Sequence, residues 1–173
     1  MAASALEMED AQHILDLLET TADHSDRYEI VRMADKKIGA GTRLGSVGNL
    51  ADARRVVELV DQVHDPFARC SFRCNYGYAL DLSSFYNDAH EQALLVLADA
   101  ADFRVDPALP YAHYVLAIAL AGLGRYSDAH RELDNAVRES RRCSDDFGLQ
   151  NAFAGRMRVL VQEGRAAEAF SGT

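Results

Sequence analysis

Apolar and small residues recur along the chain at helical spacing, in stretches that come in pairs. The clearest pair lies between Pro110 and Ser140, where a short polar turn separates two apolar stripes. Each stripe repeats every three or four residues, which predicts two amphipathic helices packed against each other. The first stripe contains Leu116, Ala117 and Leu120, and the second contains Ala129, Leu133 and Ala136.

The turn between these stretches has residues that end one helix and begin the next. Gly124 predicts a left-handed backbone at the end of the first helix. Ser127 is the expected N-cap of the second helix, because a serine hydroxyl accepts hydrogen bonds from unpaired helix amides. Small side chains at Ala117, Ala129 and Ala136 predict a close approach of the two helices.

The same unit recurs along the whole chain. A hydrophobic or small residue, any residue, an acid and then alanine occur in this order five times, 36 to 42 residues apart. The acid falls in the first turn of a predicted second helix, where it complements the helix dipole. The alanines of the five occurrences are Ala11, Ala53, Ala89, Ala129 and Ala169.

This recurrence predicts an all-α chain that forms a single domain over residues 1–173. The pattern places the second helix of a partial repeat at 6–22, repeats at about 27–64, 66–103 and 107–140, and a partial repeat at 147–171. Both partial repeats leave apolar faces without a polar capping repeat. We therefore expect a segment of a longer array, with self-association through the open ends as the alternative.

The central unit resembles the tetratricopeptide repeat (TPR). Its residues fall where that repeat places, in order, a large, a small and a large residue, glycine, an aromatic, alanine, a large residue and alanine. The spacing exceeds the usual period of about 34 residues, and is similar to the arrays of maltose-regulator-like and other LuxR-type bacterial activators. The resemblance implies a right-handed α-α superhelix, a TPR-like solenoid of antiparallel helix pairs. The matching residues are Leu116, Ala117, Leu120, Gly124, Tyr126, Ala129, Leu133 and Ala136.

In such repeats the first helices line a concave surface, so the resemblance also implies where a partner binds. Mapped by register, this surface is mixed in character and has tyrosines at its centre. Tyrosine combines a large contact area with a hydroxyl and is enriched at protein interfaces. Packing of these tyrosines between neighbouring repeats is the alternative explanation. The candidate partner-binding residues are Tyr78, Asp81, Tyr111, Tyr114, Ile118 and Arg158.

Two further patterns are better explained by helix packing than by chemistry. Residues 39–45 partly resemble a phosphate-binding glycine loop, but such a loop follows a strand, and this stretch is predicted to be helical. Cys70 and Cys74 share one face of a helix, yet no second pair completes the four ligands of a zinc site. No nucleophile–base motif stands out. We expect no catalysis, no metal and no cofactor.

Composition narrows the class of partner. The formal net charge is −9, whereas phosphate binding needs a basic surface, so direct contact with nucleic acid is not expected. Three cysteines and the lack of a secretion-signal pattern favour a reducing cytoplasm over a disulfide framework. No apolar run reaches the roughly 18 residues of a membrane helix.

These observations favour a regulatory or scaffold array that binds a protein, a peptide or a neighbouring domain by surface recognition. The LuxR-type resemblance implies an NTPase domain upstream and a DNA-binding helix-turn-helix downstream in the full gene product. A second hypothesis is an effector sensor, in which the tyrosine-lined groove closes on a small ligand or peptide. Stabilisation by a small molecule would favour the sensor.

Overall fold

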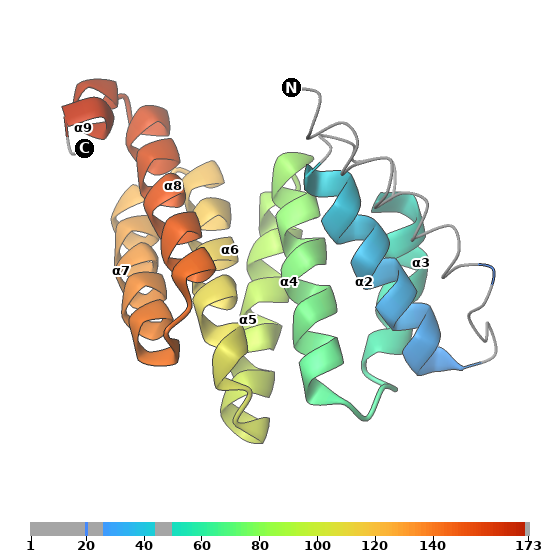
Figure 1. Ribbon diagram of the computed structural model, residues 1–173. Coiled ribbons are helices and arrows are strands. Elements are labelled where there is room, and N and C mark those ends of the chain that lie inside the picture. Colours follow the sequence, from blue (N-terminus) through green and yellow to red (C-terminus); the bar gives the residue numbers. More distant parts are fainter. Residues whose placement is uncertain (1–19, 21–25, 44–49, 172–173) are drawn as a thin grey trace, which may run out of the picture.

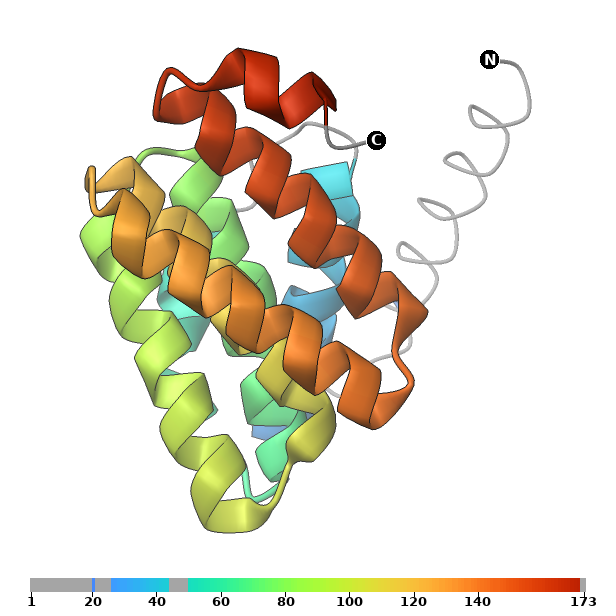
Figure 2. The ribbon, with the colours of Figure 1, turned by 90° about the vertical axis from the view of Figure 1, so that its left-hand side faces the viewer.

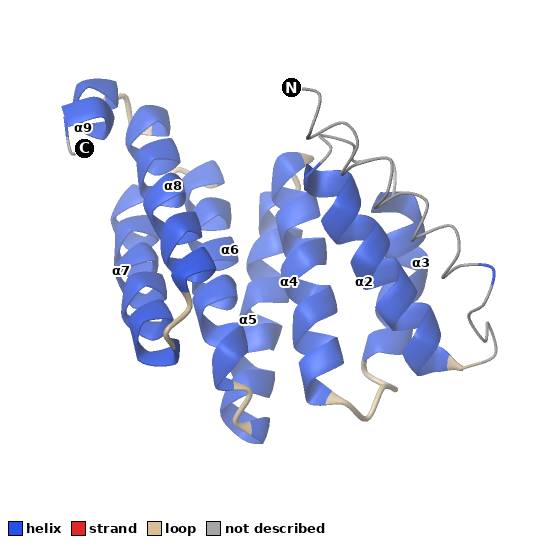
Figure 3. Ribbon diagram, viewed as in Figure 1, coloured by secondary structure: helices blue, strands red, loops and turns tan. Residues whose placement is uncertain are grey.

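The computed structural model describes residue 20, residues 26–43 and residues 50–171. Every regular element within these ranges is helical (Figure 3). Apart from residue 20, the helix expected at 6–22 lies outside the described residues. The elements are α2 (Arg27–Arg43), α3 (Leu50–Val60), α4 (Pro66–Leu82), α5 (Tyr86–Phe103), the short 3-10 helix η1 (Asp106–Ala108), α6 (Leu109–Gly122), α7 (Tyr126–Cys143), α8 (Asp146–Gln162) and α9 (Ala166–Ser171).

The helices pack in sequential pairs, as Figure 1 shows. α2 packs against α3, α4 against α5, α6 against α7, and α8 against α9. The first helices of the pairs also contact one another in order: α2 with α4, α4 with α6, and α6 with α8. Seen from the side, α5 lies at the left edge of the molecule (Figure 2). The array is all-α, and its sequential packing is consistent with a helical repeat.

Small residues at the recurring positions allow these helices to pack closely. Ala53, Ala89 and Ala129, at the recurring alanine of α3, α5 and α7, are buried. Ala117 and Ala136 are also buried, which confirms the expected close approach of α6 and α7. None of the helices in the described ranges is long and apolar enough to cross a membrane. The recurring acid lies in the first turn of each second helix, as Asp52, Asp88, Asp128 and Glu168.

The helix ends follow local chemistry, with one correction. Asp65 caps α4, because its side chain accepts a hydrogen bond from the amide two residues later, at 2.9 Å. Gly124 has a φ of 75°, which confirms the left-handed turn before α7. Ser127 is not the N-cap of α7. The amide of Ala129 already donates to the carbonyl of Arg125 at 3.0 Å, so Ser127 lies within the first turn of the helix.

Candidate functional site

Four of the six candidate residues come together in the structure. Tyr78 and Asp81 lie one turn apart near the end of α4, Tyr114 lies on α6, and Arg158 lies on α8. The rings of Tyr78 and Tyr114 are tilted against each other, with centroids 5.9 Å apart. Nη1 of Arg158 lies 2.7 Å from Oδ2 of Asp81. We call these four residues the tyrosine–arginine cluster.

The Asp81–Arg158 ion pair joins two helices that do not pack against each other. α6 contacts both α4 and α8, whereas the backbones of α4 and α8 make no contact with each other. The long side chain of Arg158 therefore reaches across α6 to meet the carboxylate. Because three successive first helices contribute to it, the cluster exists only when the array is folded.

Asp81 carries a buried charge that has one compensating partner, Arg158, in the part of the chain that the structure describes. Its side chain is 0% exposed, and neither carboxylate oxygen has a hydrogen bond of good geometry, so the attraction of Arg158 is mainly Coulombic. Burial raises the pKa of Asp81, and Arg158 offsets this rise only in part. The Arg158 side chain is 31% exposed. The guanidinium of Arg158 is therefore accessible to solvent, while the Asp81 carboxylate is buried.

A glycine in α8 makes room for Tyr114. A Cβ atom at Gly155 would lie 2.9 Å from Cε2 of Tyr114 and 3.0 Å from a methyl carbon of Leu133. Burial raises the pKa of Tyr114, and the nearby hydroxyl of Tyr78 adds to this effect, so the phenol stays protonated at neutral pH. Sequence reasoning missed Gly155. The available signal was a glycine inside a continuous helical pattern, which often has a packing reason.

The other two candidates lie outside the cluster. The ring of Tyr111 on α6 lies 6.4 Å from the ring of Phe147 on α8, and burial together with the Asp145 carboxylate raises the pKa of Tyr111. Ile118 is 0% exposed, because α6 is surrounded by α4, α5, α7 and α8. The structure thus corrects its expected place on the open surface. Phe147, 53% exposed, is an accessible aromatic side chain that sequence reasoning missed.

The described part of the glycine-rich pattern and the cysteine pair lie in helices, while residues 44–45 of that pattern lie outside the described residues. Residues 39–43 continue α2, and the Thr42 hydroxyl donates to the carbonyl of Gly39 at 3.1 Å. Cys70 and Cys74 are free thiols on α4. Burial raises the pKa of Cys70 to about 11 and that of Cys74 still further. Across the described ranges, no group of three His, Cys, Asp or Glu residues is placed to hold a metal ion.

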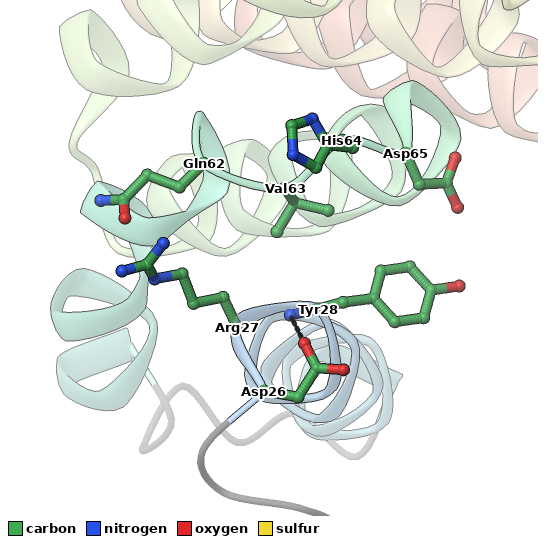
Figure 4. A pocket seen from close by; sticks show the side chains of 7 residues that line it. All are labelled: Asp26, Arg27, Tyr28, Gln62, Val63, His64 and Asp65. Atoms are coloured by element: carbon green, nitrogen blue, oxygen red, sulfur yellow. Dashed lines mark hydrogen bonds between the residues drawn. The ribbon is translucent and has the colours of Figure 1, made fainter.

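An open hollow lies beside the other end of α4, between the start of α2 and the turn that precedes α4 (Figure 4). Its two carboxylates cap helices: Asp26 accepts from the amide of Tyr28, and Asp65 from the amide of Phe67, each at 2.9 Å. These caps explain both acids without a catalytic role. The hollow is lined by Asp26, Arg27, Tyr28, Gln62, Val63, His64 and Asp65.

Comparison with known proteins gives no matching family model and no matching curated protein. The distinguishing feature of the molecule is therefore its own geometry. Three first helices bring two phenols, one carboxylate and one guanidinium to a single place.

Proposed function

We propose that this chain is a protein- or peptide-binding array of regulatory or scaffold type, which recognises its partner through the exposed parts of the tyrosine–arginine cluster. The observation that carries this proposal is the convergence of Tyr78, Tyr114 and Arg158 from three different helices. Tyrosine and arginine supply a large share of the residues that dominate binding energy at protein interfaces. The array would be a TPR-like superhelix within a larger bacterial signalling or transcription regulator, located in the cytoplasm.

Recognition would proceed through surface contacts, without bond chemistry. The two tyrosine rings offer flat apolar area and hydroxyl groups, and the guanidinium of Arg158 offers planar N–H donors. Asp81 restrains Arg158, and Gly155 lets α8 approach the Tyr114 ring. Side chains that are already held in place lose less conformational entropy when a partner binds. Asp81 is therefore a positioning residue, and Tyr78, Tyr114 and Arg158 are the contact residues.

Selection of peptides on the intact chain tests this proposal. Random peptides displayed on phage are selected against the wild-type chain, and their Kd values are then measured for Tyr78→Ala and Tyr28→Ala. Tyr28 is a matched control, because it is also half-buried on a first helix but its ring contacts Arg32. We expect Tyr78→Ala to weaken binding about tenfold or more, and Tyr28→Ala to change it little. Equal affinities for wild type and Tyr78→Ala would contradict the proposal.

Effector sensing by the same cluster is the second candidate function. It is favoured by the grouping of phenol hydroxyls with a guanidinium that a buried carboxylate restrains, since a small polar ligand needs such fixed groups. A thermal-shift screen separates the two: stabilisation by a small molecule, lost in Tyr78→Ala, favours the sensor. The signalling context has its own test. We expect the full gene product to contain an NTPase domain and a helix-turn-helix. Their absence would contradict the proposal that the array belongs to a LuxR-type regulator.

A further inference from the structure

The outward side of α5 carries an apolar stripe. Leu94 is 47% exposed and Leu95 is 39% exposed, and Ala98 and Ala101 beside them are also exposed. These four residues follow one another at helical spacing, so they share one face. Figure 2 shows α5 at the left edge of the molecule, and among the described elements its backbone packs against α4, α6 and η1. We call these four residues the α5 patch.

The repeat does not require leucine at these positions. The buried alanine near the start of each second helix puts α5 and α7 in the same register. At the positions of Leu94 and Leu95, α7 has Asp134 and Asn135. A second helix of this array therefore folds with polar side chains at these positions, of which Asp134 is exposed and Asn135 is half-buried. At the position of Leu95, α3 has Leu59, which packs against the core. At the position of Leu94, α3 has Glu58 and α7 has Asp134, so Leu94 adds exposed apolar surface that the fold does not explain, and such surface commonly marks an interaction site.

Acids lie at both ends of the patch along the helix axis. Glu91 precedes Leu94 by one turn, Asp102 follows Ala98 by one turn, and both acids are exposed. Their backbone positions are about 16 Å apart along α5, at about 1.5 Å per residue. Asp88 adds a further acid before Glu91, although it lies 4.0 Å from Arg54. An exposed cation, Arg104, follows directly after the last residue of α5.

These charges argue against a second copy of the chain as the occupant. Antiparallel pairing of two α5 helices with Leu95 opposite Ala98 would place Glu91 opposite Asp102 of the second copy. Parallel pairing would place each acid beside its own equivalent. Both arrangements bring like charges together at a surface where opposite charges favour binding. The patch complements an apolar helix with basic ends instead.

We propose that the α5 patch docks an amphipathic helix of a partner protein, with apolar side chains between two basic residues about three turns apart. The leucine side chains of the patch would pack against the apolar stripe of that helix. Glu91 and Asp102 would pair with its two basic residues and fix its position along α5. This surface is distinct from the tyrosine–arginine cluster, so the two proposals stand or fall separately.

Binding of three labelled synthetic helices tests the proposal. The first has a leucine stripe flanked by two lysines at the spacing of Glu91 and Asp102. The second has glutamates in place of the lysines, and the third has serines in place of the leucines. We expect the lysine–leucine helix to bind the intact chain at least about tenfold more tightly than the other two. No preference for it, or no binding, would overturn the proposal.

Substitutions in the chain locate the binding site. Leu94→Asp with Leu95→Asn copies the residues of α7, and should weaken binding of the lysine–leucine helix about tenfold or more while the fold is kept. Leu82→Asn is the control, because Leu82 is 41% exposed at the end of α4. Glu91→Lys with Asp102→Lys should switch the preference to the glutamate helix. Unchanged binding by the leucine variant would overturn the proposal.

Light scattering of the chain alone examines the competing occupant. We expect a single species whose mass does not change between wild type and the leucine variant. A dimer of the wild type that the leucine variant converts to monomer would show that a second copy covers the patch, and would overturn docking of a partner helix.

Discussion

Removing Arg158 from the Asp81–Arg158 pair should lower stability more than removing the charge of Asp81. Arg158→Met leaves a carboxylate that is 0% exposed without the one charged partner it has among the described residues. Breaking a buried pair in this way costs about 3–5 kcal/mol. We expect the lower end of that range, because Arg158 itself is 31% exposed and not fully withdrawn from water. Asp81→Asn removes the buried charge and lets Arg158 turn to solvent, so the change should stay within about 1 kcal/mol.

The cost of Arg158→Met should also depend on pH. Burial raises the pKa of Asp81 in the folded chain, above the value of about 3.9 expected in the unfolded chain. The folded state therefore binds the proton more tightly than the unfolded state. Stability from this group is complete below the unfolded pKa and is lost as pH rises through the folded pKa. Without Arg158 the folded pKa rises further, so the variant should lose most at pH 7 and little near pH 4.

Urea unfolding of the two single variants, the double variant and the wild type measures these differences. At pH 7 the double variant should recover most of the stability that Arg158→Met loses, because the unpaired charge is gone. The same series at pH 4, 5 and 6 shows how the stability differences change as Asp81 becomes protonated. Equal losses for both single variants at pH 7, or a loss in Arg158→Met that does not change with pH, would refute the idea of a buried charge held by one partner.

Three further predictions concern the helices around the cluster. Ser84 has a φ of 64° at the turn where the next repeat has Gly124. Because glycine relieves the strain of a left-handed backbone, Ser84→Gly should be about 0.5–1 kcal/mol more stable in urea titrations, and Gly124→Ser should be less stable by a similar amount. Gly77→Ala should lower the free energy of unfolding by about 1–3 kcal/mol, because the new Cβ would lie 2.8 Å from a valine methyl of α6. At Gly39 a new Cβ meets only ordinary contacts, so Gly39→Ala should raise the free energy of unfolding by about 1 kcal/mol. Thermal or urea unfolding measures both changes. Since burial raises the pKa of Cys70 to about 11, a thiol reagent at pH 8 should label it far more slowly in the folded chain than in urea, and equal rates would show that the thiol is accessible.

The helix pairs could be predicted from sequence because their core positions repeat. Buried alanine near the start of each second helix and an acid before it are local features, visible without knowing the packing. Ser127 shows the limit of local reasoning. This good capping residue is the second residue of α7, two positions after the N-cap Arg125, because the hydrogen bond from the amide of Ala129 to the carbonyl of Arg125 begins the helix earlier. Residue type alone does not decide which of several nearby positions is the cap.

The tyrosine–arginine cluster could be predicted only in part. The repeat register shows which positions of successive first helices are equivalent, but it does not show how exposed each side chain is. Ile118 occupies the expected column, yet α6 has neighbours on several sides and its short side chain is covered. Tyr114 is long enough to remain partly exposed beside it. The contact of Arg158 with Asp81 could not be read from the pattern, since it joins helices that do not pack together.

Both surfaces proposed for binding depart from the pattern of this array itself. At the position that Asp81 occupies in α4, α6 has the buried residue Ala121, so the fold accepts an uncharged side chain there. At the position of Leu94, α7 has Asp134. One departure buries a charge, and the other exposes an apolar side chain; each is unfavourable for stability or solubility. Other helices of the array fold without either departure, and this supports the two proposed binding surfaces.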